Sequence, residues 1–262
     1  MVSPLCLGIT ASPETVTEAY ENGVNFFFVT ADLHWPLYDG VRRGLAKLLQ
    51  GNRARRDEVV VGVVSYLDNP LFGALQFNEV IAEVPGLERV DLLIAGAVAS
   101  QASFTSRLYS MAAARQSRQH GARAIGASFH QRTLALLGGG YDLLDVSFIR
   151  YNAAHPGARR DLFPYLPPVR ACPVFNFKSV MARVTRGQFE GLGLPAGYWC
   201  PQTCDYYRFV LSRAEIDGVL CSPGSPAELR ELLKALEQGP VSEQEEEYMI
   251  WLAGLTQAPA LT

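Results

Sequence analysis

The stretch that decides the fold is GVNFFFVTADLHWPLYD, at residues 23–39. Its first half, up to Thr30, is a run of apolar, β-branched and aromatic residues, which predicts a strand buried on both faces. Its second half is a polar loop that contains Asp32 and His34. In folds that repeat a strand and a helix, functional side chains commonly follow the carboxyl ends of the strands. We therefore expect this loop to lie in a functional site.

Seven other segments also have the composition of buried strands, and helical patterns separate them. The expected strands are 5–10, 58–64, 90–95, 123–127, 142–149, 172–177 and 216–221, and the clearest expected helices are 38–50, 104–119, 202–213, 225–237 and 242–252. Eight alternations without a break in composition predict a single domain over residues 1–262, an α/β fold of the (β/α)8 TIM-barrel type with an extra C-terminal helix. An open doubly wound sheet is disfavoured because the glycine-rich turn that it needs is missing after the first expected strand.

Composition restricts the classes of function. The chain has 262 residues, of which 48% are hydrophobic and 19% charged, which suits a globular core. A formal net charge of −3 gives no indication of a nucleic-acid partner. No apolar run is long enough to cross a bilayer and no signal-peptide pattern begins the chain, so we expect a cytoplasmic protein without a membrane partner. Cys200 and Cys204 lack a second pair or a nearby His, so no structural zinc is expected.

Several segments resemble the aldo-keto reductases in their order and spacing. GVNFFFVTA at 23–31 is similar to the second strand of that family, and VDLLIAG at 90–96 is similar to its fourth. The other similar segments are RDEVVVGV at 56–63, ARAIGASFH at 122–130, SFIRYNAAHPGA at 147–158, CDYYRFVLS at 204–212 and VLCSPGSPAELRELLKAL at 219–236. The resemblance implies a (β/α)8 barrel, NADPH-dependent reduction of carbonyl groups and a catalytic tetrad of Asp, Tyr, Lys and His.

The tetrad of that family is replaced in this chain. Aligned at the end of the second strand, the four positions are occupied by Val29, His34, Val64 and Gly96, and a register shifted by one residue puts Phe28 and Leu33 at the first two. Hydride transfer to a carbonyl needs a proton donor beside the oxygen, and the family's tyrosine supplies it. None of the family's catalytic groups stands at its expected position here.

The positions that bind the cofactor are altered as well. By the resemblance, Phe129 and Phe148 replace two of the polar residues that hold the nicotinamide carboxamide. The residues that remain for cofactor binding are Ser128, Phe175 as the aromatic that stacks on nicotinamide, and Ser222, Gly224 and Ser225 before a helix whose N-terminus can bind an anion. We therefore expect that no cofactor is required, with weak NADPH binding as the open alternative.

Polar side chains at the expected strand ends are the candidate catalytic residues. They are His34, Asp32, Lys178, Arg150 and Tyr38. His34 can act as an acid and base near neutral pH, with Asp32 or Tyr38 to orient it. Arg150 can hold a carboxylate, and a desolvated Lys178 can act as a base or form an imine. Other polar residues at these ends include Ser65, Tyr66, His130, Tyr151, Asn152 and Asn176.

Each candidate also has a structural interpretation. His34 can simply pack beside Trp35, Arg150 can tie its loop to Asp161 or Glu88, and Lys178 can be an ordinary exposed lysine. A metal site made of Asp32, His34 and His130 lacks a diagnostic spacing, so none is expected.

The hypothesis that these residues favour is an aldo-keto-reductase-like barrel enzyme that has lost the reductase tetrad. It would catalyse non-redox acid/base chemistry, such as cyclisation, dehydration or isomerisation, on a small-molecule or peptide-like substrate. Two alternatives stay open. One is an NADPH-dependent carbonyl reductase with His34 or Tyr38 as an unorthodox proton donor, and the other is a non-catalytic binding protein that uses the same pocket.

Overall fold

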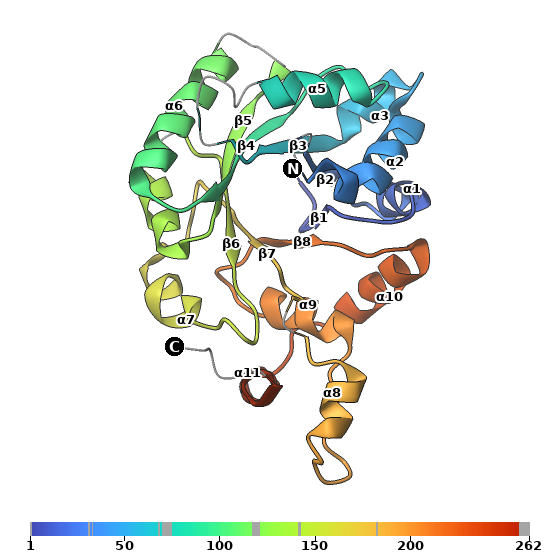
Figure 1. The fold of residues 1–262 in the computed structure, drawn as a ribbon, viewed down its shortest axis with the longest axis vertical. Coiled ribbons are helices and arrows are strands. Elements are labelled where there is room, and N and C mark those ends of the chain that lie inside the picture. The colour runs from blue at the N-terminus through green and yellow to red at the C-terminus, as the bar shows by residue number, and fades with distance from the viewer. Residues whose placement is uncertain are drawn as a thin grey trace.

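A computed structural model shows eight parallel strands closed into a barrel, with helices around the outside (Figure 1). The structure describes residues 2–30, 32, 34–67, 69, 75–116, 121–140, 143–181 and 183–256, without the side chains of 75 and 138–140. The strands are β1 (Leu5–Leu7), β2 (Phe26–Thr30), β3 (Val60–Ser65), β4 (Leu92–Val98), β5 (Ala124–Phe129), β6 (Val146–Arg150), β7 (Val174–Phe177) and β8 (Gly218–Cys221). They follow chain order around the barrel, so the (β/α)8 prediction is confirmed.

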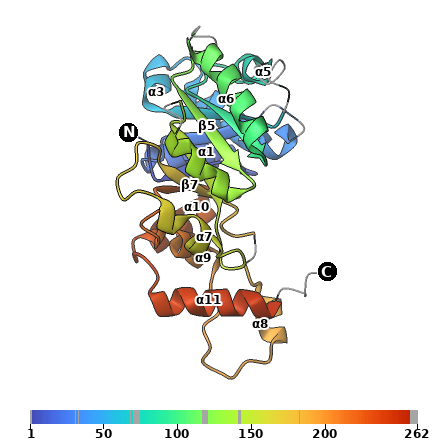
Figure 2. The same cartoon turned by 90° about the vertical axis from the view of Figure 1, so that its left-hand side faces the viewer.

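Helices surround the barrel in the part of the chain that the structure describes. They are α1 (Glu14–Glu21), α2 (Asp39–Leu49), α3 (Arg53–Glu58), α5 (Leu75–Glu83), α6 (Gln101–Gln116), α7 (Ala158–Asp161), α8 (Arg186–Gly191), α9 (Thr203–Leu211), α10 (Pro226–Leu236) and α11 (Glu243–Thr256), with 3₁₀ helices η1 (Trp35–Tyr38), η3 (Arg132–Gly140) and η4 (Phe163–Tyr165). The predicted extra C-terminal helix is α11. Figure 2 shows it lying across one end of the molecule, close to the projecting arm that carries α8.

The interior of the barrel is filled with aromatic rings. Phe26, Phe148 and Phe175 form a cluster with ring centroids 5.3–6.3 Å apart, and Phe28 adds a contact of 5.5 Å with Phe148. Layers of large inward-facing side chains are what make such a barrel a packed core rather than a pore. The closed packing leaves space for a ligand only at the ends of the barrel.

A buried ion pair stabilises the amino-terminal end of β3 and β4. Arg56 is fully buried, and its guanidinium donates hydrogen bonds to the carbonyl oxygens of Leu87, Val59 and Arg89. It also donates to Asp91 Oδ2 at 2.7 Å. Every polar atom that a buried charge leaves unpaired is costly, so this full set of partners explains how an arginine is tolerated there.

Candidate functional site

A cavity of about 570 Å³ opens at the carboxyl ends of the strands. Its lining comes from, or directly follows, all eight strands, and most of its surface is apolar. This is the end of a (β/α)8 barrel where active sites are found, and the volume suits a small organic ligand. Five of the predicted site residues line it: His34, Tyr38, Ser128, Lys178 and Ser222.

Asp32 holds the imidazole of His34 in a defined orientation. Asp32 Oδ1 accepts a hydrogen bond from the His34 backbone N–H at 2.9 Å and lies 3.0 Å from His34 Nδ1. Asp32 Oδ2 accepts from the Tyr66 N–H at 3.3 Å. The Asp32 side chain is only 6% exposed, whereas that of His34 is 50% exposed and lines the cavity. A carboxylate on Nδ1 fixes the tautomer and leaves Nε2 as the reactive ring nitrogen.

Two phenols lie beside this pair. The ring of Tyr66 packs on the ring of His34, with centroids 4.5 Å apart, and the Tyr38 hydroxyl lies near the Tyr66 hydroxyl. Burial and the charge of Asp32 raise the pKa of Tyr66 to about 12. Burial and the neighbouring Tyr66 also raise the pKa of Tyr38 well above its usual range. Both phenols are therefore protonated at neutral pH and can donate hydrogen bonds.

Tyr66 occupies space that a side chain on β4 would otherwise fill. A Cβ placed on Gly96 would lie 2.6 Å from the Tyr66 ring and 2.6 Å from a Val64 methyl group. Gly96 is the position where the resemblance expects the family's histidine. Its lack of a side chain lets the Tyr66 ring approach β4, where it meets His34. The sequence pattern had marked Tyr66 only as one polar residue among several at strand ends.

Gly96→Ala is expected to displace Tyr66 and to lower the free energy of unfolding by about 1–3 kcal/mol, the usual cost of overpacking. The shift would also alter the surroundings of the His34 ring. Urea unfolding measures the first effect and the NMR resonances of the His34 imidazole measure the second. Gly254→Ala is the matched control, since nothing lies within 4 Å of a Cβ at that position. Unchanged stability together with unchanged His34 resonances would contradict the close packing.

Two residues that line the cavity have strained backbone. Among the described non-glycine residues, Glu88, Ala97 and Lys178 have positive φ angles, and the last two line the cavity. The values are 53° at Ala97 and 60° at Lys178. Such a conformation costs about 1–3 kcal/mol in a residue with a side chain and is concentrated at functional sites. The Asn152 side-chain amide donates to the Lys178 carbonyl at 2.9 Å and helps to hold it.

Arg150 and Phe175 lie elsewhere than the cavity lining. Arg150 ends β6 at the rim, and the interpretation that ties it to Asp161 is wrong, because Arg132 makes both hydrogen bonds to that carboxylate. Phe175 is 2% exposed and lies in the barrel core, so it cannot stack on a ligand at the mouth. The aromatic residue that lines the cavity is Phe177, two residues later on the same face of β7.

The loop before α10 is arranged against binding of a phosphate. The Gly224 N–H donates to Glu228 Oε2 at 2.8 Å, and Ser225 Oγ accepts from the Glu228 N–H at 3.3 Å. Pro226 has no N–H to offer, and the arginine of this helix, Arg230, pairs with Glu18 at 3.0 Å. A phosphate group at this loop would meet the Glu228 carboxylate. Of the residues expected to bind the carboxamide, Ser128 lines the cavity.

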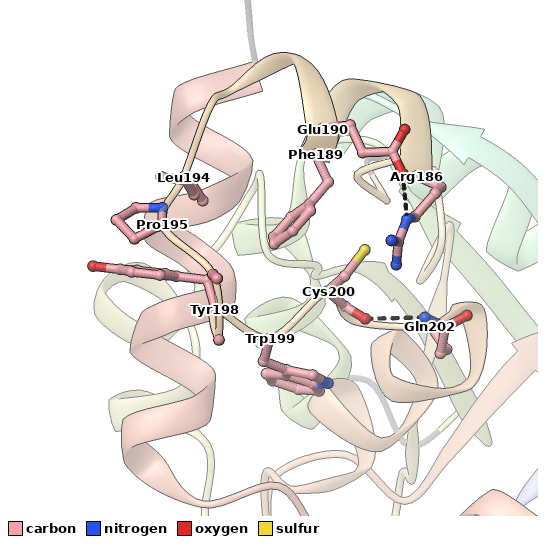
Figure 3. Close-up of a pocket in the computed structure, with 11 residues that line it drawn as sticks. Arg186, Phe189, Glu190, Leu194, Pro195, Tyr198, Trp199, Cys200 and Gln202 are labelled. Atoms are coloured by element: carbon pink, nitrogen blue, oxygen red, sulfur yellow. Dashed lines mark hydrogen bonds and ion pairs between the residues drawn. The ribbon is translucent and has the colours of Figure 1, made fainter.

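A second hollow, of about 590 Å³, lies on the α8 arm (Figure 3). Its polar groups bind one another: Arg186 pairs with Glu190 at 2.7 Å, and the Gln202 amide donates to the Cys200 carbonyl at 3.0 Å. The arm projects away from the strands in Figures 1 and 2. This hollow does not bring together acid and base groups as the mouth of the barrel does. We therefore assign the candidate site to the mouth.

The described residues set two further limits. No group of three or more His, Cys, Asp or Glu side chains among them could hold a metal ion, so the set of Asp32, His34 and His130 does not form one. Within the same residues, no helix is long and apolar enough to cross a membrane.

Comparison with known proteins finds the fold and little else. No family model matches the chain, and no curated protein matches it. Among solved structures, the aldo-keto reductase AKR11C1 from Bacillus halodurans matches with a TM-score of 0.68 and 14% identity in its apo form, and 0.69 and 13% in its holo form. MGS-M4, an aldo-keto reductase from a Medee basin deep-sea metagenome library, matches with a TM-score of 0.66 and 14% identity. Each match covers 99% of this chain and 94% of the other.

Proposed function

We propose that this protein, whose barrel has the fold of the aldo-keto reductases, is an enzyme that transfers protons rather than hydride. It acts on a small organic substrate and does so without a nicotinamide cofactor. The observation that supports this proposal is the Asp32–His34 pair at the rim of the cavity, with the Tyr66 phenol against the imidazole. A base oriented by a carboxylate, beside a protonated hydroxyl, is the equipment of general acid/base catalysis.

The first step is removal of a proton from a carbon next to a carbonyl group. Nε2 of His34 takes the proton, and the electron pair of the C–H bond moves to the carbonyl oxygen to give an enolate. The Tyr66 phenol donates a hydrogen bond to that oxygen, where negative charge develops. The Tyr38 phenol, which is also protonated, lies beside Tyr66.

The second step returns the proton and determines the product. If the substrate has a β,γ double bond, the enolate is a dienolate; protonation of its γ carbon by the imidazolium of His34 moves the double bond, and the reaction is an isomerisation. If the imidazolium protonates a hydroxyl group on the β carbon, water leaves and the reaction is a dehydration. Asp32 stabilises the imidazolium between the two steps, as a carboxylate on Nδ1 does in other enzymes.

The second candidate function is an NADPH-dependent carbonyl reductase. The observation in its favour is that protonated phenols, Tyr66 and Tyr38, lie at the mouth of an aldo-keto-reductase barrel although the tyrosine of the tetrad is absent. The Glu228 carboxylate on Gly224 opposes it. The two functions differ in their need for the nucleotide, which gives a direct test.

The dissociation constant of NADPH is expected to lie above the sub-micromolar range. Each hydrogen bond that a buried carboxamide cannot make costs about 1–3 kcal/mol, and Phe148 offers none. Calorimetric titration of the whole protein with NADPH measures the affinity. Glu228→Gln is the informative variant: loss of the charge near Gly224 should strengthen NADPH binding if this carboxylate excludes the phosphate. Sub-micromolar binding to the unaltered protein would contradict the proposal and favour the reductase.

Deuterium exchange tests the proton-transfer function itself. The protein is incubated in D2O, without nucleotide, with a panel of small ketones and 2-oxo acids such as phenylpyruvate. Loss of the C–H signal next to the carbonyl in the proton NMR spectrum, above the rate without protein, supports the proposal. Turnover of the same panel only when NADPH is oxidised would favour the reductase.

A further inference from the structure

The mouth of the barrel has two chemically different sides. In the closed order of strands, β2 and β3 lie opposite β6 and β7. The groups that transfer protons, Asp32, His34 and Tyr66, follow β2 and β3. The basic residues His130, Arg150 and Lys178 stand at the ends of β5, β6 and β7, and we call them the basic wall. The cavity lies between the two sides, because both His34 and Lys178 line it.

The strand register brings the basic wall together. Arg150 is paired in register with Phe177, which directly precedes Lys178. Side chains two residues apart on a strand share a face, so Arg150 lies above Phe148, which lines the cavity. His130 also lines the cavity, and its ring stacks on that of Phe177 with centroids 6.4 Å apart.

The basic wall carries net positive charge. Neither Lys178 nor Arg150 forms an ion pair within the part of the chain that the structure describes. Burial lowers the pKa of His130, and the charges of Lys178 and Arg150 lower it further. Burial lowers the pKa of His155, and the charges of Arg150, Arg132 and Lys178 lower it further. Lys178 and Arg150 therefore contribute to the lower pKa of two imidazoles and have no carboxylate partner among the described residues. An anion bound beside them would be stabilised by their charge.

We propose that the basic wall binds an anionic group, a carboxylate or a phosphate, of the substrate. The inference deepens the proposed function and rests on it for the role of the bound molecule. The anion contacts Lys178 and Arg150, the apolar body of the substrate packs on Phe177 and Phe148, and the reacting carbon reaches His34 across the cavity. Lys178 lines the cavity and has a left-handed backbone, a strain that is concentrated at functional sites.

Binding of aromatic probes tests the basic wall without any turnover. The probes are benzoate, phenyl phosphate and the neutral benzamide, titrated into the whole protein by ligand-observed NMR. We expect saturable binding of at least one anion in the millimolar range or tighter, and benzamide at least about tenfold weaker, the factor that 1.4 kcal/mol gives. Tighter binding of phenyl phosphate identifies phosphate as the anion, and tighter binding of benzoate identifies carboxylate.

Variants at the wall complete the test. Lys178→Asn removes the charge but tolerates a left-handed backbone, and it should weaken anion binding by about 10-fold or more. Lys178→Arg keeps the charge and should bind within about threefold of the original protein. The control is Lys47→Gln, because Lys47 is exposed on α2 and pairs with Glu14. Equal binding of benzamide and benzoate, no saturable anion binding, or an unaffected Lys178→Asn would overturn the proposal.

The same titration separates this inference from the proposed function. His34→Ala removes the base but leaves the basic wall intact, so the anions should bind to it as they do to the unaltered protein. If anion binding requires Lys178 while His34→Ala retains full activity, the basic wall stands and the proton-transfer function fails. If His34 is needed for exchange but the anions do not bind, the proton-transfer function stands and the basic wall fails.

Discussion

Replacing His34 with alanine is expected to lower turnover by about 10²–10⁴-fold, the usual contribution of a positioned general acid or base. The loss follows because no other imidazole at the mouth has a carboxylate on Nδ1 among the described residues; His155 Nδ1 faces Asn152, a neutral amide. The melting temperature should change little, since the side chain is 50% exposed. Deuterium exchange rates and thermal unfolding of the same preparation give both quantities.

Two comparisons make the His34 experiment decisive. Trp35→Phe changes the next residue, which does not line the cavity, and should leave activity unchanged. A structural role for His34 predicts the reverse pattern, with a lower melting temperature and normal activity per folded molecule. Full activity in a well-folded His34→Ala protein would remove His34 from the mechanism and make Lys178 the next candidate base.

Arg56→Ala is expected to cost about 3–5 kcal/mol of the free energy of unfolding, the typical loss when one partner of a buried ion pair is removed. Among the described residues, the substitution leaves Asp91, which is 6% exposed, with only the 3.3 Å contact to Arg89 as an ion pair, and it removes the guanidinium donor from three carbonyl oxygens. Activity per folded molecule should be unchanged, because the pair lies at the end of the barrel opposite the cavity. Urea unfolding and activity at low denaturant measure the two effects.

An exposed arginine is the control for Arg56. Arg186 forms an ion pair with Glu190 on the α8 arm, and both side chains are mostly in solvent. Arg186→Ala should change the free energy of unfolding by no more than about 0.5 kcal/mol. If Arg56→Ala lost no more than this control does, the buried network would not be a significant source of stability.

Much of the fold follows from the sequence because the strands are buried on both faces and helices separate them. Asp32 and His34 were also predictable, since they follow the most apolar strand in a polar loop. Which single residue of a strand lines the cavity was not predictable, because it depends on where that strand ends. β7 ends at Phe177, and this places Phe175 one layer deeper than the resemblance implies.

Tyr66 was missed for a different reason. Its role depends on the absence of a side chain at Gly96, which lies 30 residues away and on another strand. The arrangement at Gly224 did have a local signal. Ser225 followed three residues later by Glu228 is the pattern of a helix whose own residues satisfy its first N–H groups. This pattern by itself predicts a helix N-terminus whose first N–H groups are already hydrogen-bonded within the chain.

The Glu228 carboxylate on Gly224 has a consequence for the life of the protein in the cell. A barrel that leaves this corner for a nucleotide gains part of its stability by mass action, and its folding then depends on the supply of that nucleotide. Here the negative charge belongs to the chain itself, because the Glu228 carboxylate accepts a hydrogen bond from the Gly224 N–H. We therefore expect newly made chains to satisfy the Gly224 N–H as soon as α10 forms.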